Sequence, residues 1–528
     1  MSVAASSSSV GSPVRNLLAG TATKYVLLAV NLAMGIVLMP FTVRHLGTSQ
    51  YGLWMLVASL TSYFQLLDLG YGSGLVRHIA DADARGDVPR VNRLLSTFAV
   101  VYAGLGLVAA AAIAVLVSTV VPRFPHLSET QVRTGQLVLA ILGIRMAVGF
   151  PMTVFGAATT ARQRFALNNT IAIAVALVNG AVTFIVLESG FGLLALVSST
   201  AAVGLASYGA YIWSAHRAFP GLQLRLASFD RSLVRDVTSF SLYLFVIDVA
   251  VQIGFNFDNV VVGAALGTSA VAVYAVCLRM ADYQRQLACQ FNGLLFPVAV
   301  RLGAGGRGAA LETMLIEGTR IALVLATGVT ICAIGFAEPL LTRWMGPAFE
   351  AGIVPFYVLA VAGIVLVGQG PLGNILLGTG RHRLVACISL GEALANLGLS
   401  VILVRPFGML GVAVGTAIPV VVANLFILLP AACRQFGLTP MAFLRRVLPA
   451  PASGILPAVA ACLFLRFRYP PASVAAVLVE GAIVGLVYLA AVLVFGFDRQ
   501  VRARYAGYVR HILAPPREAV RHHVAEAS

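Results

Sequence analysis

The sequence predicts an all-α polytopic membrane protein with about fourteen transmembrane helices. Hydrophobic residues make up 59% of the 528 residues, charged residues make up only 11%, and the mean hydropathy is +0.91. Soluble domains carry about 25% charged residues, so nearly the whole chain, rather than a single anchor, belongs in lipid. The apolar runs are long and unbroken, which favours helices over the short alternating strands of a closed barrel.

Seven apolar runs contain no Asp, Glu, Lys or Arg, and each reaches roughly the 18 residues that cross a bilayer. In chain order these runs are Tyr25–Val43, Leu94–Pro122, Phe165–Leu187, Ser189–Ala215, Ala351–Gly380, Pro406–Cys433 and Val447–Leu465. Seven further segments are long enough but are interrupted by charges, near 51–78, 131–160, 237–264, 270–300, 314–338, 384–404 and 473–496. Together they give the expected fourteen spans.

The basic residues predict the orientation. The formal net charge is +16, and if the N-terminus, every second loop and the C-terminus share one side, that side carries 24 arginines against seven on the other. An excess of Lys and Arg marks the cytoplasmic side of a membrane protein. We therefore expect both termini in the cytoplasm.

A weak internal repeat predicts two halves of six spans each. Leu46-Gly47-Thr48-Ser49 follows the first span, and Leu266-Gly267-Thr268-Ser269 follows the seventh. Arg162-Gln163-Arg164 and Arg381-His382-Arg383 precede the fifth and eleventh spans at nearly the same offset. Six spans is an even number, so the halves are parallel repeats. The expected organisation is a disordered cytoplasmic lead (1–18), an N-lobe (19–216), a cytoplasmic linker (217–236), a C-lobe (237–434), two extra spans (447–496) and a basic cytoplasmic tail (497–528).

Ionisable residues inside the spans are the candidate functional residues, because a charge in the bilayer usually faces a bundle interior or a wet cavity. Arg145 lies at the middle of the fourth span, and Arg279, Asp282 and Gln286 share one face of the eighth, with Arg285 at its edge. Arginine binds phosphate oxygens bidentately. We predict that Lys24, Arg145, Arg279 and Arg285 bind an anionic ligand, most simply a lipid-linked phosphate or pyrophosphate. We predict that the polar or coupling residues of the cavity are Asp68, Asp248, Gln252, Asp258, Asp282 and Gln286.

Bland interpretations stay open for several of these residues. Arg279 and Asp282 could form an internal pair, Lys24 could snorkel to the headgroups, and Asp68 could cap a helix.

Pro151 and Pro371 interrupt the fourth and tenth spans beside glycines, and we expect them to be gating kinks, because proline removes a backbone hydrogen bond.

Other chemistries lack their residues. The sole lysine, Lys24, is not part of a Gly-Lys-Ser/Thr motif, so a Walker A phosphate loop is excluded. No His/Cys cluster has metal-ligand spacing, and Asp81-Ala82-Asp83 lies in a short turn without the domain that a glycosyltransferase needs. We expect no cofactor, no metal site, no nucleic-acid partner and no enzymatic activity.

Two stretches resemble a known family. The first runs from Arg44-His45-Leu46-Gly47 through Tyr51-Gly52-Leu53-Trp54 to Leu67-Asp68-Leu69-Gly70 and Arg77, and the second from Phe257-Asp258-Asn259 through Leu266-Gly267 to Tyr274. They are similar to bacterial polysaccharide flippases of the multidrug/oligosaccharidyl-lipid/polysaccharide exporter superfamily. With the span layout, the resemblance covers nearly the whole chain.

The resemblance implies two six-helix lobes with alternating access around a cationic cavity. It implies that the cargo is an undecaprenyl-pyrophosphate-linked oligosaccharide, moved across the bacterial inner membrane for exopolysaccharide, capsule or O-antigen synthesis. Related lipid II flippases use cations on spans one, two and eight; Lys24 and Arg279 or Arg285 match, whereas Arg77 matches span two poorly. Spans Val447–Leu465 and Ser473–Gly496 would line a groove for the prenyl tail.

The implied partners are the lipid-linked substrate, membrane lipids, a polysaccharide polymerase and glycosyltransferases. An ion-coupled multidrug exporter of the same superfamily remains the alternative, kept open by Asp248, Asp258 and Asp282. A membrane enzyme of glycan assembly is a third.

Overall fold

The computed structural model describes residues 13–289, 292, 295–305 and 308–497, and within these every regular element is helical. The helices in chain order are α1 (Pro13–Ser62), α2 (Tyr71–Ala84), α3 (Val88–Val115), α4 (Glu129–Ala161), α5 (Phe165–Glu188), α6 (Leu193–Ala218), α7 (Arg231–Leu266), α8 (Thr268–Cys289), α9 (Leu295–Ala304), α10 (Gly308–Gly335), α11 (Ala337–Trp344), α12 (Ile353–Gly378), α13 (His382–Val422), α14 (Leu429–Arg434), α15 (Pro440–Val447), α16 (Pro449–Arg468) and α17 (Val474–Ala491). The all-α prediction is confirmed. The predicted lead and tail fall mostly outside the described residues, although α1 already begins at Pro13.

Ten helical stretches of the described residues are long and apolar enough to cross a membrane. Two of them, Ala19–Ala84 and His382–Arg434, are broken at Gly47 and Gly408, which have non-helical backbone angles. Counting each broken stretch as two passages and adding α7 and α8, which occupy the seventh and eighth expected positions, gives the fourteen predicted spans.

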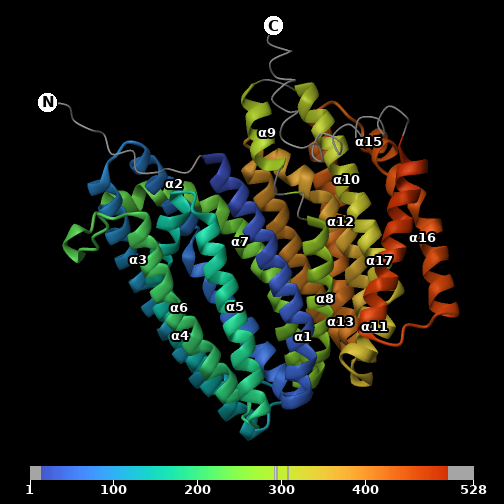
Figure 1. The fold of residues 1–528 in the computed structure, drawn as a ribbon, viewed down its shortest axis with the longest axis horizontal. Coiled ribbons are helices and arrows are strands. Elements are labelled where there is room, and N and C mark those ends of the chain that lie inside the picture. The colour runs from blue at the N-terminus through green and yellow to red at the C-terminus, as the bar shows by residue number, and fades with distance from the viewer. Residues whose placement is uncertain (1–12, 290–291, 293–294, 306–307, 498–528) are drawn as a thin grey trace. The chain divides into compact units, whose positions relative to one another are not determined.

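The chain forms two compact units. Unit 1 comprises residues 1–280, 345–359 and 382–419, and unit 2 comprises residues 281–344, 360–381 and 420–528. In unit 1, α1 packs along α5, and α4 packs between α3 and α6 (Figure 1). In unit 2, α10 packs against both α16 and α17. The division into lobes 19–216 and 237–434 stays a prediction.

The two copies of the Leu-Gly-Thr-Ser motif have the same backbone conformation. Gly47 has φ 77° and ψ 163°, and Gly267 has φ 84° and ψ 175°. This region is open essentially to glycine alone, because a side chain would collide with its own backbone. The copies also meet in unit 1: the amide of Gln131 donates to Ser49 Oγ at 2.7 Å and to Thr268 Oγ1 at 3.1 Å. The repeat read from the sequence is therefore a repeat of structure at this point.

Glycine also sets how closely the motif copies approach. A Cβ built on Gly52 of α1 would overlap the backbone carbonyl of Thr268 at the start of α8. Backbone cannot yield as a flexible side chain can, so the two segments could not keep this separation with any larger residue at position 52.

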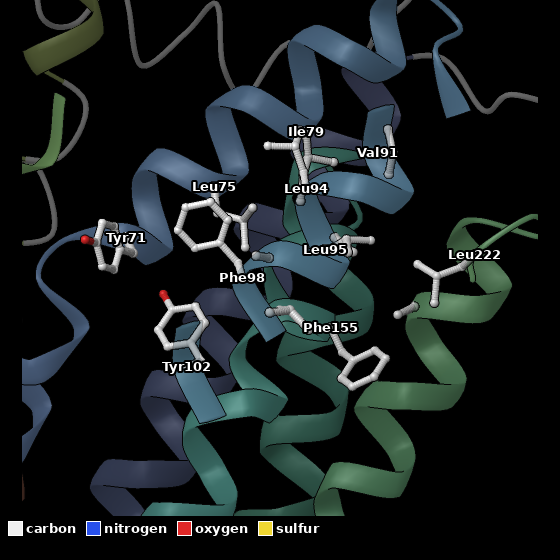
Figure 2. Packing of buried hydrophobic residues seen from close by; sticks show 14 of the residues in the cluster. Tyr71, Leu75, Ile79, Val91, Leu94, Leu95, Phe98, Tyr102, Phe155 and Leu222 are labelled. Atoms are coloured by element: carbon white, nitrogen blue, oxygen red, sulfur yellow. The ribbon is translucent and has the colours of Figure 1, made fainter. Parts of the chain in front are cut away.

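The buried core of unit 1 fills the space between α2, α3, α4 and the segment after α6 (Figure 2). Its fully buried members recur at helical spacing, with Leu75, Ile79 and Ala82 along α2 and Leu94, Leu95, Phe98 and Tyr102 along α3. Phe155 of α4 and Leu222 close the cluster. This spacing puts one face of each helix against its neighbours.

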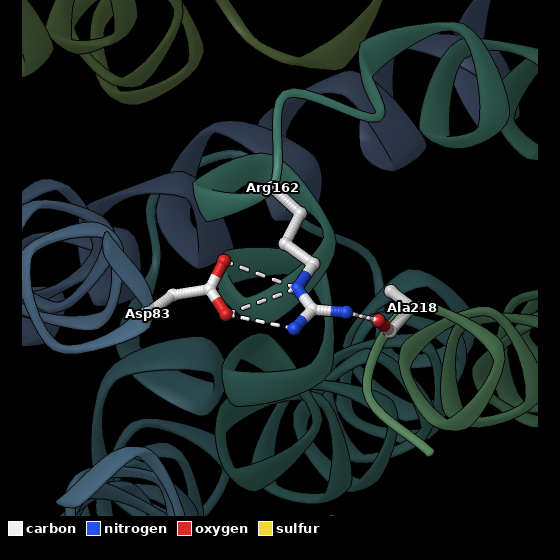
Figure 3. Close-up of polar contacts among 3 residues, drawn as sticks. All are labelled: Asp83, Arg162 and Ala218. Carbon is white, nitrogen blue, oxygen red and sulfur yellow. Dashed lines mark hydrogen bonds and ion pairs between the residues drawn. The ribbon is translucent and has the colours of Figure 1, made fainter. Parts of the chain in front are cut away.

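An arginine ties three helix ends together beside this core. Arg162, which caps α4, pairs with Asp83 near the end of α2, with Nη2 to Oδ1 at 2.7 Å and Nε to Oδ2 at 3.1 Å (Figure 3). Its Nη1 donates to the carbonyl of Ala218 at the end of α6, and its guanidinium lies 3.9 Å from the ring centroid of Phe219. Asp81 pairs with Arg85. Both carboxylates of the Asp-x-Asp motif are therefore held in ion pairs.

The segment 219–230, which we term the strap, follows α3 instead of forming a free linker. Asn92 pairs with it in both directions, donating to the Gly221 carbonyl at 2.9 Å and accepting from Gln223 N at 3.1 Å. Ser96 Oγ accepts from Arg225 N at 3.1 Å, and Thr97 Oγ1 accepts from Asp230 N at 3.0 Å. Three polar side chains of α3 thus provide hydrogen-bond partners for the backbone of the strap, as a neighbouring strand would in a sheet.

Asp230 ends the strap and starts α7. Its Oδ1 accepts from the hydroxyl of Ser232 at 2.6 Å and from the backbone N–H of Ser232 at 2.9 Å. These hydrogen bonds to the charged form hold the pKa of Asp230 below its usual range. A carboxylate at this place also complements the helix dipole.

Replacing Gly52 with Val should destabilise the protein, because the side chain meets backbone rather than a movable group. We expect a loss of about 1–3 kcal/mol, seen as a lower apparent Tm in a thermal size-exclusion assay. Gly104→Ala on α3 is the matched control, since a Cβ there meets nothing within 4 Å. Equal Tm values for the two variants would contradict the close contact at Thr268.

Removing the side chains that hold the strap should expose it to protease. In the Asn92→Ala/Ser96→Ala variant, trypsin should cut after Arg225 at least several times faster than in the unchanged protein, because cleavage needs a locally freed backbone. Timed digestion followed by mass spectrometry identifies the cut. Ser198→Ala, on an exposed hydroxyl bonded within its own helix, is the control; identical digestion rates for all three proteins would rule out a tethered strap.

Candidate functional site

The candidate site is a cavity of about 1090 Å³ inside unit 1, bounded by α1, α2, α4, α5, α6 and α7. Its lining residues are Ala58, Thr61, Ser62, Gln65, Leu66, Asp68, Leu69, Gly70, Gly72, Val76, Leu142, Arg145, Met146, Gly149, Phe150, Met152, Thr153, Gly156, Ala157, Thr160, Asn168, Asn169, Ala172, Tyr208, Tyr211, Phe245 and Gln252. Three of the predicted site residues, Arg145, Asp68 and Gln252, share this cavity although the sequence separates them widely.

Arg145 enters the cavity from the middle of α4. Its guanidinium lies against the bare Cα of Gly204 on α6, and the hydroxyl of Tyr208, one turn further along α6, lies beside it. Among the described residues, no carboxylate forms an ion pair with Arg145. The cross-helix partners of this arginine are therefore a glycine and a tyrosine, which leave its charge uncompensated.

Asp68 lines the same cavity but is already engaged. It ends the short helix Tyr63–Asp68, and the turn Leu69-Gly70, with φ of 50° and 73°, leads into α2. Asp68 Oδ2 accepts from the Gly72 N–H at 3.2 Å, and Oδ1 accepts from the Tyr102 hydroxyl. The carboxylate thus caps α2, as the bland interpretation expected, while facing the cavity.

Lys24 is not among the residues that line the cavity. It lies on α1, and its side chain is exposed. Gln252 of α7 holds its place by donating to the Ser62 carbonyl at 2.6 Å and accepting from Asn256. The side chain of Asp248 lies outside the described residues, so its predicted role stays a prediction.

Asp258 occupies a second polar cluster of unit 1. The side chain is 1% exposed, and its Oδ2 accepts from Tyr274 Oη at 3.0 Å and from Thr416 Oγ1 at 2.8 Å. Asn396 and Ser400 of α13 extend the network through a bond of 3.0 Å. A carboxylate, an amide oxygen and two hydroxyls in this arrangement can hold either a proton or a hard cation. Among the described residues, no group of three or more His, Cys, Asp or Glu side chains has an arrangement that could hold a metal ion.

The predicted stripe on α8 is split between the units. Arg279 belongs to unit 1 and has an exposed side chain. In unit 2, Asp282 Oδ1 accepts from Arg285 at 2.6 Å, and Oδ2 accepts from Gln286 at 2.6 Å. Arg285, three residues along the same helix, is thus an ion-pair partner of Asp282.

The backbone carbonyls freed by Pro151 and Pro371, the two predicted kinks, are accommodated by different means. Pro151 lets the Ala147 carbonyl of α4 go without its usual N–H partner, and that oxygen lies against Gly106 of α3. Pro371 does the same to Val367 in α12, where the side-chain amide of Asn292 donates to the freed carbonyl at 3.2 Å. Asn374 donates back to the Asn292 carbonyl at 2.9 Å. This pair of hydrogen bonds, the Asn292 clasp, joins α12, which runs continuously through Pro371, to the segment after α8.

The cavity contains residues that charge-based reading of the sequence missed. Gln65, Asn168, Asn169, Tyr208 and Tyr211 are uncharged and lie in helices where single polar residues are common. The available signals were the paired asparagines at the start of the fifth span and the glycines at 149 and 156. Gly149 makes room for the Tyr208 hydroxyl, and Gly156 leaves open space in the wall of α4.

Known proteins resemble most of the chain. A family model described as polysaccharide biosynthesis protein matches residues 17–302, more than half of the chain. The uncharacterized membrane protein EpsK of Bacillus subtilis is 23% identical over 438 residues, covering 81% of this chain and 85% of that protein. The uncharacterized membrane protein MJ1068 of Methanocaldococcus jannaschii is 24% identical over 199 residues, covering 38% and 39% of the respective chains.

Solved structures share the fold. The inward closed conformation of the lipid II flippase MurJ has a TM-score of 0.68 at 12% identity, covering 88% of this chain and 97% of that one. An inward-facing multidrug resistance transporter of the MATE family has a TM-score of 0.63 at 15% identity, covering 79% and 98%. The helices of this chain therefore follow the arrangement of membrane transporters.

Replacing Asn292 with Ala should leave the Val367 carbonyl buried without a partner. The expected cost is about 1–3 kcal/mol, measured as a fall in apparent Tm. Asn31→Ala, on an exposed asparagine of α1, supplies the control and should leave the Tm unchanged. An Asn292→Ala variant as stable as this control would show that the hydrogen bond from Asn292 to the Val367 carbonyl does not contribute to stability.

Proposed function

The chain belongs to the polysaccharide biosynthesis protein family, and from this premise we propose that it is a flippase for lipid-linked oligosaccharides. Its substrate is an undecaprenyl-pyrophosphate-linked repeat unit of an exopolysaccharide, capsule or O-antigen. The protein moves this unit across the bacterial inner membrane, with both of its own termini in the cytoplasm, and works beside a polymerase and glycosyltransferases. It catalyses no covalent step.

The observation that carries the proposal is the cavity with a charged and amide-lined wall in a chain of membrane-crossing helices. Its volume, about 1090 Å³, exceeds the roughly 300–1,000 Å³ typical of sites for drug-sized molecules. Arg145 lies inside this helical unit without a carboxylate partner among the described residues, which costs free energy that a polar ligand can offset. A glycan that must pass through the membrane is a ligand of this size and polarity.

The cationic residues give the anionic part of the substrate its partners. We assign the pyrophosphate to Lys24, Arg279 and Arg285, whose charges lie on the first and eighth spans. Arginine can hold phosphate oxygens bidentately, and lysine acts as a point charge. Pro151 and Pro371, inside α4 and α12, supply places where these helices can bend during alternating access.

An ion-coupled multidrug exporter is the second candidate, supported by the MATE likeness and by the buried carboxylate of Asp258. A drug exporter would confer resistance when expressed and leave surface polysaccharide unchanged on deletion. A flippase would do the reverse. Asp258 serves either candidate as a coupling residue.

Deleting the gene should abolish the surface polysaccharide and make the lipid-linked repeat unit accumulate, because the polymerase is deprived of substrate across the membrane. The unchanged gene should restore export. The Arg279→Ala/Arg285→Ala variant, expressed at equal level, should restore less than about a tenth of it, as expected for two lost charge-assisted contacts.

Arg85→Gln, which removes an exposed arginine paired with Asp81, is the control and should restore export fully. Polymer is quantified on the cell surface, and the lipid-linked unit in organic extracts. Normal polymer in the deletion strain would eliminate the flippase proposal. Full export by the double variant would eliminate only the assignment of the pyrophosphate to span eight.

A further inference from the structure

The cavity lining has the composition of a sugar-binding surface. Aromatic rings from three helices face it, namely Phe150 of α4, Tyr208 and Tyr211 of α6, and Phe245 of α7. Such rings offer flat apolar faces for the C–H side of a pyranose, and tyrosine adds a hydroxyl that can donate or accept. Gln65 and Tyr211 form no hydrogen bond with the described residues, so their polar groups remain available.

The amides deeper in the wall are partly committed. Asn169 Nδ2 donates to the Gly20 carbonyl and to Thr23 Oγ1, both at 3.1 Å, which leaves its Oδ1 as an acceptor. Asn168 bonds with Thr159 and Thr160 and serves to join α4 to α5. The wall is therefore held rigid by some of its polar groups, while Gln65, Tyr211 and Asn169 Oδ1 offer hydrogen bonds to a ligand.

The lining holds one charge of each sign, and the two form no ion pair with each other. Among the residues that line the cavity, Arg145 is the one base and Asp68 the one acid. The two Asp68 oxygens accept from Gly72 N and from Tyr102 Oη. A pyrophosphate carries more than one negative charge and would meet Asp68 in the same space. A single carboxylate on a sugar matches the single guanidinium.

The position of Arg145 fits a carboxylate in geometry as well as in charge. Its guanidinium is backed by Gly204, where any Cβ would overlap it, so one side of the group is packed and the opposite side is open to the cavity. Tyr208, beside the guanidinium, adds a hydroxyl to the same point. A planar guanidinium binds both oxygens of a carboxylate at once, and a neighbouring hydroxyl can donate to one of them.

We propose that Arg145 and Tyr208 form a subsite for the carboxylate of an acidic sugar, and that the cavity therefore selects repeat units that carry a uronic acid. The inference rests on the proposed function and deepens it, because it names the class of glycan. Gln65, Tyr211 and Asn169 hold the neighbouring sugar hydroxyls, and the aromatic rings hold the sugar faces. The pyrophosphate is bound elsewhere.

The test measures the binding of soluble glycan probes to the full-length protein in nanodiscs, by saturation-transfer NMR and titration. The probes are trigalacturonate, maltotriose as a neutral sugar of equal length, and inorganic pyrophosphate. The unchanged protein should bind trigalacturonate about tenfold more tightly than maltotriose, the difference that one charge-assisted bidentate contact provides. Arg145→Gln should remove this preference and leave maltotriose binding unchanged.

Two further variants sharpen the assignment. Arg145→Lys keeps the charge without the fork and should restore only part of the preference, while Tyr208→Phe should reduce it by a few fold. Arg85→Gln, on the exposed pair with Asp81, should bind all three probes as the unchanged protein does. Thermal stability of each variant is measured alongside, so that loss of folding is recognised.

Three results would overturn the inference: equal affinity for the acidic and the neutral sugar in the unchanged protein, no binding of either sugar, or loss of pyrophosphate binding alone in Arg145→Gln. The last result would place the pyrophosphate at Arg145. Failure of the inference is distinguishable from failure of the flippase proposal. If deletion abolishes the polymer while the cavity ignores the carboxylate, only the subsite is wrong; if the cavity selects the acidic sugar but deletion leaves the polymer intact, only the flippase role is wrong.

Discussion

A helix in lipid must pair its backbone N–H and C=O groups within itself, and the rest of this structure depends on the prolines that prevent this pairing. Hydrocarbon offers no hydrogen bond to a carbonyl that a proline has freed, so neighbouring protein groups must accommodate that carbonyl. At Pro371, the side-chain amide of Asn292 donates a hydrogen bond to the freed carbonyl. At Pro151, Gly106 has no side chain, which lets the freed Ala147 carbonyl approach α3. The cavity lies beside Pro151, and Gly149 and Gly156 of α4 line it. At both prolines, therefore, a residue of a neighbouring segment accommodates the freed carbonyl.

The charges of the chain divide into two populations with different physical roles. Most of the described ion pairs lie at helix ends, as with Arg162 and Asp83, Arg466 and Glu338, or Arg446 and Glu312. There an arginine often takes a carbonyl as well, as Arg162 does at Ala218 and Arg466 at Gly335. Arg145 differs, because it lies in the middle of a helix and has neither partner. The net charge of +16 belongs to the whole chain, whereas the charged residues that line the cavity are Arg145 and Asp68.

Much of the fold could be predicted from the sequence, because each membrane-crossing helix is a long run of mostly apolar residues. The span positions, the break after Leu46 and its repetition after Leu266 were all predictable, and the glycines of both motifs adopt the same left-handed, extended conformation. The site was less predictable. Arg145, Asp68 and Gln252 do share a cavity, but Asp258 lies in a separate buried network, and Arg285 pairs with Asp282. A one-dimensional pattern places a residue on a face of its own helix, and it cannot say which neighbour that face meets.

The strap has a consequence for the order in which the protein is made. The hydrogen bonds that tie the strap to α3 join residues 92–97 to residues 221–230, so all of these partners have been synthesised before α7 enters the membrane. The clamp of Arg162 on Asp83 and Ala218 is complete at the same moment. The first six helices can therefore fold and close off one end as a finished piece while the ribosome is still translating the remainder. The seventh helix then starts from a fixed anchor at Asp230, which limits the orientations in which the second half of the chain can be inserted.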